Sequence, residues 1–249
     1  AQFVDTHVFG GAESIAVDLS ESLNELGHTS LIFHFGNPEM EAYCSKRHVH
    51  HFVLPNLSEY RSWKTLPIFA WNFAHTLKTQ GVGLLHSHLF GSVIAGSLST
   101  VLARVPHVGS LHDLYTLEES PKRIRALQAA TLLGTRLVCV AEILEKYCRE
   151  HCTFSRSRLR TIHNGVRTEV QESPNGGITR GALGATEQDV LFVSVGRLVP
   201  LKRHELLIEA VSLLPKELPV KLFILGDGPE KERLQKQIEA LSVQEKVTP

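Results

Sequence analysis

Hydrophobic positions along the chain fall into two alternating patterns. Short continuous apolar runs predict buried strands, and apolar residues recurring every three or four positions predict amphipathic helices. The strands are predicted at 2–5, 29–33, 49–54, 82–88, 107–111, 136–140, 159–162, 190–195 and 220–225, and the helices from Gly11 to Gly27 (with Ile15, Leu19, Leu23 and Leu26 on one face) and at 66–78, 92–103, 121–133, 142–152, 206–214 and 230–241. This alternation is typical of parallel sheets covered by helices, so we predict an α/β protein.

Turn-forming residues divide the pattern into two Rossmann-like units. Asn164–Gly165 signals a turn, and Ser173–Gly177 has the composition of a linker. We predict a first domain at 1–170, a linker at 171–183 and a second domain at 184–249.

The second unit is expected to be incomplete. It is shorter than a usual domain, and Val247–Thr248 looks like a strand that is only beginning. The first residue is Ala1 rather than an initiator Met, so we expect both ends to be cut. Phe192, Phe223 and Leu225 should then be incompletely covered.

Composition is ordinary for a soluble globular protein, with 43% of the 249 residues hydrophobic and 21% charged. The 26 Lys and Arg residues balance the 26 Asp and Glu residues, so no general field attracts nucleic acid or an anionic membrane. A local patch stays open: Arg61, Trp63 and Lys64 suit a membrane surface as well as a polysaccharide. The cysteines follow no disulfide framework, so we expect a cytoplasmic protein, with peripheral membrane contact left open. Ala1–Asp5 also lacks the features of a signal peptide.

The four cysteines are predicted to be reduced thiols, since their spacing follows no disulfide framework. Cys148 and Cys152 lie four residues apart on a predicted helix and could share a metal ion, but burial is the favoured interpretation. The chain is therefore predicted to hold no metal.

Two glycine turns each connect a predicted strand to a helix, which is where α/β proteins bind anions. Gly10–Gly11 is the first, and on its own it could be a simple turn. Gly196 opens the second, where Arg197 and Lys202 add two cations that suit a diphosphate. The two turns suggest two Rossmann-like units facing one ligand.

Further polar residues follow other predicted strands. Asp227, between Gly226 and Gly228, is expected to cap the next helix. His112 follows the strand that ends at Leu111 and is favoured as a hydrogen-bond partner of a sugar or phosphate. His86 and His88 share one face of a strand, where a structural role is favoured over a metal site.

Several other chemistries lack their signatures. The chain has no Gly-x4-Gly-Lys-Ser/Thr motif of P-loop NTPases and no Gly-x-Gly-x-x-Gly fingerprint, which disfavours NAD. It has no Gly-x-Ser-x-Gly elbow and no legible Ser-His-Asp or Cys-His order.

Taken together, these motifs resemble the family 4 retaining glycosyltransferases of the GT-B fold. The resemblance covers essentially the whole chain and depends on the order and spacing of several short motifs. They are Gly10–Glu13, His112–Asp113, Asn164–Val166, Arg180-x-x-Leu183–Gly184, Val193–Leu198 with Lys202, and Gly226–Pro229.

The resemblance implies transfer of a sugar from a nucleotide-diphosphate sugar, which is a co-substrate, to a glycan, lipid or small-molecule acceptor. It implies retained anomeric configuration, no essential metal, an acceptor-side first domain and a donor-binding second domain. Arg197 and Lys202 would neutralise the leaving diphosphate and His112 would contact the donor sugar. The turns at Gly10–Gly11, Gly196 and Gly226 would approach the donor through their backbones.

The family also carries two Glu residues, seven apart, in a region that would follow Pro249, so the donor site is expected to be incomplete in this chain. Acceptor loops are expected at Asn37–Lys46 and Leu57–Lys64. Two alternatives stay open: a nucleotide-sugar epimerase of the same fold, and a non-catalytic module that binds a sugar, a phosphate or a partner chain. The early Gly10–Gly11 and the Arg197 and Lys202 pattern fit a transferase better than an epimerase.

Overall fold

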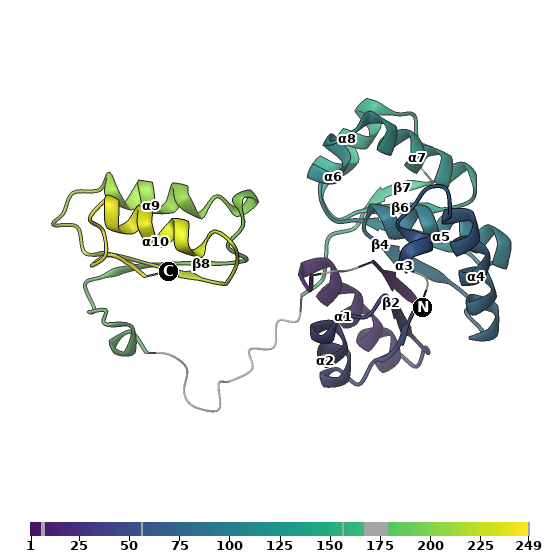
Figure 1. Ribbon diagram of the computed structural model, residues 1–249, viewed down its shortest axis with the longest axis horizontal. Helices are drawn as coiled ribbons and strands as arrows, with labels where there is room; N and C mark the ends of the chain where they lie inside the picture. The colour runs from purple at the N-terminus through teal and green to yellow at the C-terminus, as the bar shows by residue number, and fades with distance from the viewer. Residues whose placement is uncertain (6–7, 56, 156, 167–178, 249) are drawn as a thin grey trace. The chain divides into compact units, whose positions relative to one another are not determined.

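The computed structural model describes residues 1–5, 8–55, 57–155, 157–166 and 179–248. The chain divides into two compact units, Ala1–Arg167 and Thr168–Pro249. Each contains a parallel sheet with helices packed on it (Figure 1), which confirms the predicted α/β class. Most of the predicted linker at 171–183 lies outside the described residues. Among those that are described, no helix combines the length and the apolar character needed to span a bilayer.

The first unit alternates strands and helices from its first residues. Its elements are β1 (Gln2–Val4), α1 (Gly11–Glu25), β2 (Leu31–His34), α2 (Pro38–Lys46), β3 (His50–Val53), α3 (Leu57–Tyr60), α4 (Leu66–Thr79), β4 (Leu85–His88), α5 (Phe90–Ala103), β5 (His107–Leu111), α6 (Tyr115–Glu118), α7 (Pro121–Leu132), β6 (Arg136–Cys139), α8 (Glu142–His151) and β7 (Leu159–Thr161). The strands form one seven-stranded sheet in the order β3-β2-β1-β4-β5-β6-β7.

The strand order reverses direction between β1 and β4. From β1 the chain adds β2 and β3 on one side, and β4 to β7 follow on the other. All neighbours are parallel; Phe3, for example, is paired with Phe33 of β2 and with Ser87 of β4. Ligands of open α/β sheets bind at the carboxyl edge beside such a reversal. The residues that follow β1, β4 and β5 therefore come together at the place where a ligand is expected.

Successive residues of β1 supply the two faces of this sheet, because side chains alternate along a strand. Phe3 packs against Phe69 and Phe73 of α4, and its ring centroid lies 4.8 Å from that of Phe73. Val4 faces the other way and packs with Val17 of α1. A third cluster joins β5, β6 and β7 to α5, α7 and α8.

The second unit is a smaller version of the same architecture. It consists of a 3-10 turn (Gly181–Leu183), β8 (Val190–Val195), a 3-10 turn (Pro200–Lys202), α9 (His204–Ser212), β9 (Val220–Leu225), α10 (Lys231–Ala240) and β10 (Val247–Thr248). The strands are parallel in the order β10-β9-β8, and a cluster around Leu222 and Ile238 joins them to α9 and α10. Phe192 and Leu225 are exposed as expected, whereas Phe223 is buried, contrary to the prediction.

Three local predictions are corrected. Asn37–Lys46 is not a loop but helix α2, whose first turn is fixed because Oδ1 of Asn37 accepts a hydrogen bond from the backbone N–H of Met40 at 3.1 Å. Part of Leu57–Lys64 is likewise helical, as α3. The buried face of α1 consists of Glu13, Ala16, Val17 and Ser20 rather than the leucine face, and Leu26 is 75% exposed.

Candidate functional site

The predicted glycine turn of the first unit lies directly at the start of α1. Gly10 precedes the helix in an extended conformation, and no side chain caps the helix there. A Cβ atom on Gly10 would come 3.2 Å from Oε2 of Glu13, whereas one on Gly11 would meet nothing within 4 Å. Gly11 therefore presents open backbone at the positive end of a helix dipole.

A chain of hydrogen bonds crosses the three strands beside this turn. Nε2 of His88 on β4 donates to Oε1 of Gln2 on β1 at 2.9 Å. Nδ1 of His88 then accepts from Nε2 of His112, just after β5, at 3.0 Å. A carbonyl oxygen can only accept, so Gln2 selects the tautomer of neutral His88, and His88 selects that of neutral His112. Nδ1 of His112 is left as an acceptor for a ligand hydroxyl.

Burial keeps these imidazoles neutral. His88 is 1% exposed, and burial, followed by the neighbouring imidazoles, lowers its pKa well below the ordinary value. Burial likewise lowers the pKa of His86 to about 4, and Nε2 of His86 hydrogen-bonds Oγ of Ser110 at 2.8 Å. Burial lowers the pKa of His112 too, although the Asp113 carboxylate partly offsets it. The cluster therefore offers hydrogen bonds rather than positive charge.

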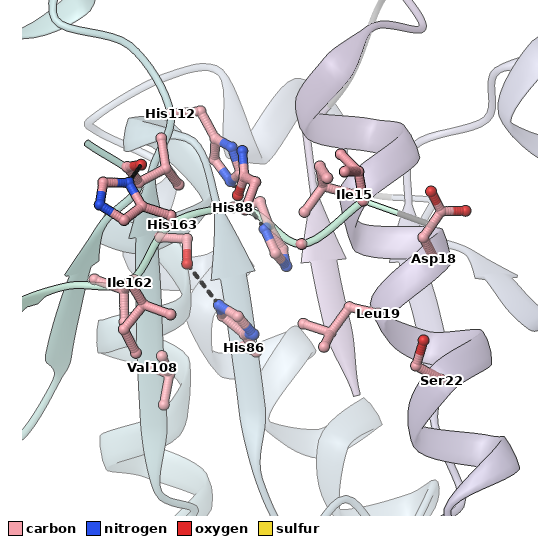
Figure 2. A pocket seen from close by; sticks show the side chains of 16 residues that line it. Ile15, Asp18, Leu19, Ser22, His86, His88, Val108, His112, Ile162 and His163 are labelled. Carbon is pink, nitrogen blue, oxygen red and sulfur yellow. Dashed lines mark hydrogen bonds between the residues drawn. The ribbon is translucent and has the colours of Figure 1, made fainter. Parts of the chain in front are cut away.

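A cavity of about 460 Å³ extends from this cluster over one face of the sheet. Figure 2 shows Ile15 and Leu19 of α1 on one side of it and the strands that carry His86 and His88 on the other. Its lining is mainly apolar, with His112 at one end; Gly10 and Gly11 are not among the lining residues. Ile15 and Leu19 of the apolar face predicted for α1 thus line a cavity instead of a core.

The predicted turns of the second unit are packed backbone to backbone. A Cβ atom on Gly226 would come 1.9 Å from the carbonyl oxygen of Gly196, and one on Gly228 would come 2.4 Å from that of Leu198. The Leu198 N–H donates to the carbonyl of Asp227 at 2.9 Å. The turns after β8 and β9 are therefore one rigid assembly at the carboxyl edge of this sheet, and their contact requires glycine.

The two predicted cations lie exposed on this assembly. Among the described residues, neither Arg197 nor Lys202 forms an ion pair, whereas Nε of the neighbouring Arg203 binds Glu205 Oε1 at 2.6 Å. The Lys202 side chain lies over Gly196, with Cε 3.8 Å from where a Cβ atom would be. The charges of Arg197 and Lys202 are therefore available to an anion, while that of Arg203 is used locally.

Two residues that the sequence analysis did not identify, His204 and Gln2, support Arg197 and His112 respectively. The buried His204 donates from Nε2 to the carbonyl of Arg197 and accepts from Oγ of Ser194, both at 3.3 Å. Gln2 supports His112 through His88, as described above. Neither belongs to a sequence motif; a histidine that opens a helix after a cationic turn was the one signal available for His204. Asp227, by contrast, is not the predicted cap: its carboxylate is exposed, 3.9 Å from the Lys231 ammonium.

The described part of the chain contains no group of three or more His, Cys, Asp or Glu side chains arranged to hold a metal ion. All four cysteines are free. Cys148 is buried beside Cys139, and Sγ of Cys152 instead donates to Oε1 of Gln128 at 3.0 Å.

Comparison with known proteins matches each of the two units to a glycosyltransferase family model. The sequence model described as Glycosyltransferase Family 4 matches residues 9–170, and that described as Glycosyl transferases group 1 matches residues 178–248. A D-inositol 3-phosphate glycosyltransferase of Nocardioides sp. strain JS614 is 26% identical over 230 residues, which are 84% of this chain and 50% of that protein. The one from Mycolicibacterium smegmatis is 25% identical over 181 residues, 66% of this chain and 41% of its own length. The chain thus spans half or less of the length of these relatives.

Solved structures resemble nearly the entire chain. Anabaena Alr3699/HepE in complex with UDP has a TM-score of 0.78 at 21% identity, covering 99% of this chain and 67% of its own. The same protein in complex with UDP-glucose gives the same TM-score, identity and coverage. A glycosyltransferase from Rickettsia africae ESF-5 has a TM-score of 0.78 at 19% identity, covering 99% of this chain and 66% of its own. At these identities the likeness shows the fold, which is of the GT-B type predicted from the sequence.

Proposed function

The chain belongs to glycosyltransferase family 4, and we propose that it transfers a sugar from a nucleotide-diphosphate sugar to an acceptor. One observation in the structure carries the proposal. Arg197 and Lys202 are exposed cations without an ion pair among the described residues, and they flank glycine turns at the carboxyl ends of two parallel strands. The N–H groups of Gly196 and Leu198 donate to the carbonyls of Leu225 and Asp227, so anion binding rests on the two cations, whose charge matches that of a diphosphate.

In this proposal the second unit holds the leaving group. As the bond between sugar and phosphate breaks, negative charge grows on the diphosphate, and Arg197 and Lys202 stabilise it. Gly196 and Gly226 keep the turn compact, because side chains there would displace one backbone from the other. His204 fixes the carbonyl of Arg197, and so the base of that side chain.

The first unit contributes groups for the sugar. His112, with its Nδ1 as acceptor, binds a hydroxyl of the donor sugar, and the open backbone at Gly10–Gly11 approaches the reacting centre. The reaction retains the anomeric configuration and uses no metal, as the family resemblance implies. The cytoplasm is the proposed location, which suits four cysteines without disulfides.

The choice of nucleotide is supported only by analogy. UDP and UDP-glucose are the ligands in the Anabaena structures, so a uridine nucleotide is the first candidate donor. The relatives named D-inositol 3-phosphate glycosyltransferases make a small phosphorylated alcohol one candidate acceptor, beside glycans and lipids.

Calorimetric titration with UDP, ADP and GDP tests the binding step, and proton NMR of the products tests the chemistry. We expect weak binding of one nucleoside diphosphate, because the donor site is expected to lack its Glu pair. Any transfer product should have an anomeric coupling that matches that of the donor sugar. Inverted coupling would contradict retention. Release of free sugar without acceptor would point to the epimerase alternative. Binding without turnover would favour the non-catalytic alternative only in a protein that contains the Glu pair, because the incomplete donor site predicts the same result.

A further inference from the structure

A long segment of the first unit carries positive charge only. Residues 60–112 contain no Asp or Glu, although the whole chain has equal numbers of acids and bases. The segment does contain Arg61, Lys64, Lys78 and Arg104. It forms α4, β4, α5 and β5, and α4 and α5 lie side by side on one face of the sheet (Figure 1). Lys64 precedes α4 and Lys78 lies in its last turn, so the segment adds positive charge at both ends of this helix.

Both tryptophans of the chain are exposed, one on α4 and one just before it. Trp63, just before α4, is 80% exposed, and Trp71 on α4 is 69% exposed. Ile68, one helical turn before Trp71, is exposed as well. Tryptophan is a large side chain that is buried on average, so two exposed ones within nine positions need an explanation. Trp63, Lys64, Ile68, Trp71 and Lys78 are called the Trp surface below.

The folding of α4 does not require these side chains. Its opposite side carries Phe69, Phe73 and Leu77, which are fully buried in the core of the sheet. Ile68 and Trp71 point away from that core because they fall on the other side of the helix. The apolar area of the Trp surface is therefore free for an external partner.

Charges around the Trp surface restrict the kind of partner. The Lys64 ammonium lies 6.0 Å from the centroid of the Trp63 ring, and Lys78 follows Trp71 by two helical turns. The nearest preceding carboxylate in the sequence, Glu59, accepts a hydrogen bond from Nδ2 of Asn72 at 3.0 Å. An aromatic surface flanked by lysines matches the interface of an anionic bilayer, where indole rings lie at the headgroup level and lysines meet phosphates.

We propose that the Trp surface docks the protein on an anionic lipid bilayer. A neutral glycan is the less suitable partner, because an uncharged ligand gains no Coulombic attraction from the two lysines. The two tryptophans enter the headgroup region, while Lys64 and Lys78 hold the phosphates beside them. This inference does not depend on the proposed sugar transfer.

Vesicle binding tests the proposed docking. Tryptophan fluorescence reports on the Trp surface directly, since Trp63 and Trp71 are the only tryptophans in the chain. The 249-residue protein is mixed with vesicles of phosphatidylcholine alone, or of equal amounts of phosphatidylcholine and phosphatidylglycerol. We expect sedimentation with the anionic vesicles only, a shift of tryptophan emission to shorter wavelength, and loss of both effects in high salt. An unchanged spectrum with anionic vesicles would overturn the proposal, as would a shift with a soluble polysaccharide instead.

Matched variants distinguish docking through the Trp surface from nonspecific electrostatic and hydrophobic binding. Trp63→Ser with Trp71→Ser should lower the partition coefficient at least tenfold, and Lys64→Glu with Lys78→Glu by about fivefold or more per site. Leu26→Ser and Lys46→Glu are the controls, because these residues are exposed at the carboxyl ends of α1 and α2, which pack on the other face of the sheet. Equal losses in the controls would contradict the assignment to the Trp surface. Circular dichroism confirms that each variant is folded.

Discussion

The imidazoles of His88 and His112 are joined by a hydrogen bond of 3.0 Å between Nδ1 of His88 and Nε2 of His112. Both residues line the cavity, but His88 is buried in the middle of the sheet whereas His112 is only partly buried. Because Gln2 binds the other nitrogen of His88, the direction of both hydrogen bonds is determined while the rings are neutral. His88 and Gln2 thus position His112 for the role proposed above.

The first prediction concerns this tautomer. In the wild-type protein, nitrogen NMR should show the proton of neutral His112 on Nε2. His88→Ala removes the acceptor, so the two tautomers of His112 should approach their ordinary mixture. His86→Gln is the matched control, because His86 hydrogen-bonds Ser110 and leaves the bond between His88 and His112 in place. A wild-type proton on Nδ1 of His112 would refute the relay.

The second prediction concerns the stability of the fold at acid pH. Burial lowers the pKa of His107 to about 3 and that of His86 to about 4 in the folded protein, against 6.5 when unfolded. At a pH between 6.5 and the pKa of the folded state, each of these histidines is protonated in the unfolded chain but not in the folded one. The free energy of unfolding therefore falls as the pH falls below about 6.5. Each such histidine lowers the free energy of unfolding by roughly 1.4 kcal/mol per pH unit within this pH range. Urea unfolding should therefore show a clear loss between about pH 7 and about pH 5.

A variant checks that the loss comes from the buried histidines. His107 hydrogen-bonds Thr135 and Ser87 through its two nitrogens, so His107→Gln should be less stable than wild type at neutral pH. It should also lose less stability on acidification, because one titrating group has gone. A pH dependence as steep as that of the wild type would exclude His107 as a contributor.

The third prediction concerns the contact between the two glycine turns of the second unit. Gly226→Ala places a methyl group within 1.9 Å of the Gly196 carbonyl, so one backbone must move. We expect a loss of about 2 kcal/mol or more in the unfolding free energy of this unit, together with weaker nucleotide binding. Gly181→Ala is the control, because a Cβ atom there meets nothing within 4 Å. Equal effects of the two variants on thermal unfolding would disprove the packing argument.

The fourth prediction separates the two sides of α4. Phe73 is 1% exposed and contacts Phe3 and Phe33, so Phe73→Ala should cost about 3–5 kcal/mol of unfolding free energy. Trp71→Ala, two residues away, should change it by no more than about 0.5 kcal/mol. Chemical denaturation of both variants measures the difference. A large loss in Trp71→Ala would mean that the Trp surface serves folding rather than docking.

Strand and helix positions could largely be predicted from the sequence, because the period of the apolar residues differs between the two. The strand at 190–195 and the helix that ends near Lys78 are examples. Helix α2 was missed, since its signal is the cap at Asn37 and the following proline rather than an apolar stripe. Which side of α1 is buried could not be predicted either, because Ile15 and Leu19 of the predicted apolar face line a cavity that only the folded sheet creates.

The candidate site was predictable only where one short motif contains it. The cations Arg197 and Lys202 are seen in the sequence because they flank Gly196. The support that His88 gives to His112 joins residues of different strands, and Gln2 lies 86 positions from His88. The glycine contact between two turns likewise depends on the neighbouring positions of β8 and β9. Such relationships follow from strand order, which local sequence does not contain.

Titration of UDP into the 249-residue chain and into Arg197→Ala tests the central claim most directly, with Arg203→Ala as the matched control. Arg203 is a neighbouring exposed arginine whose charge is already paired with Glu205. We predict that Arg197→Ala weakens binding by about tenfold to a hundredfold, the range for losing a charge-assisted hydrogen bond, and that Arg203→Ala leaves it nearly unchanged. Equal affinities of wild type and Arg197→Ala would contradict the claim that this turn binds the diphosphate of the donor.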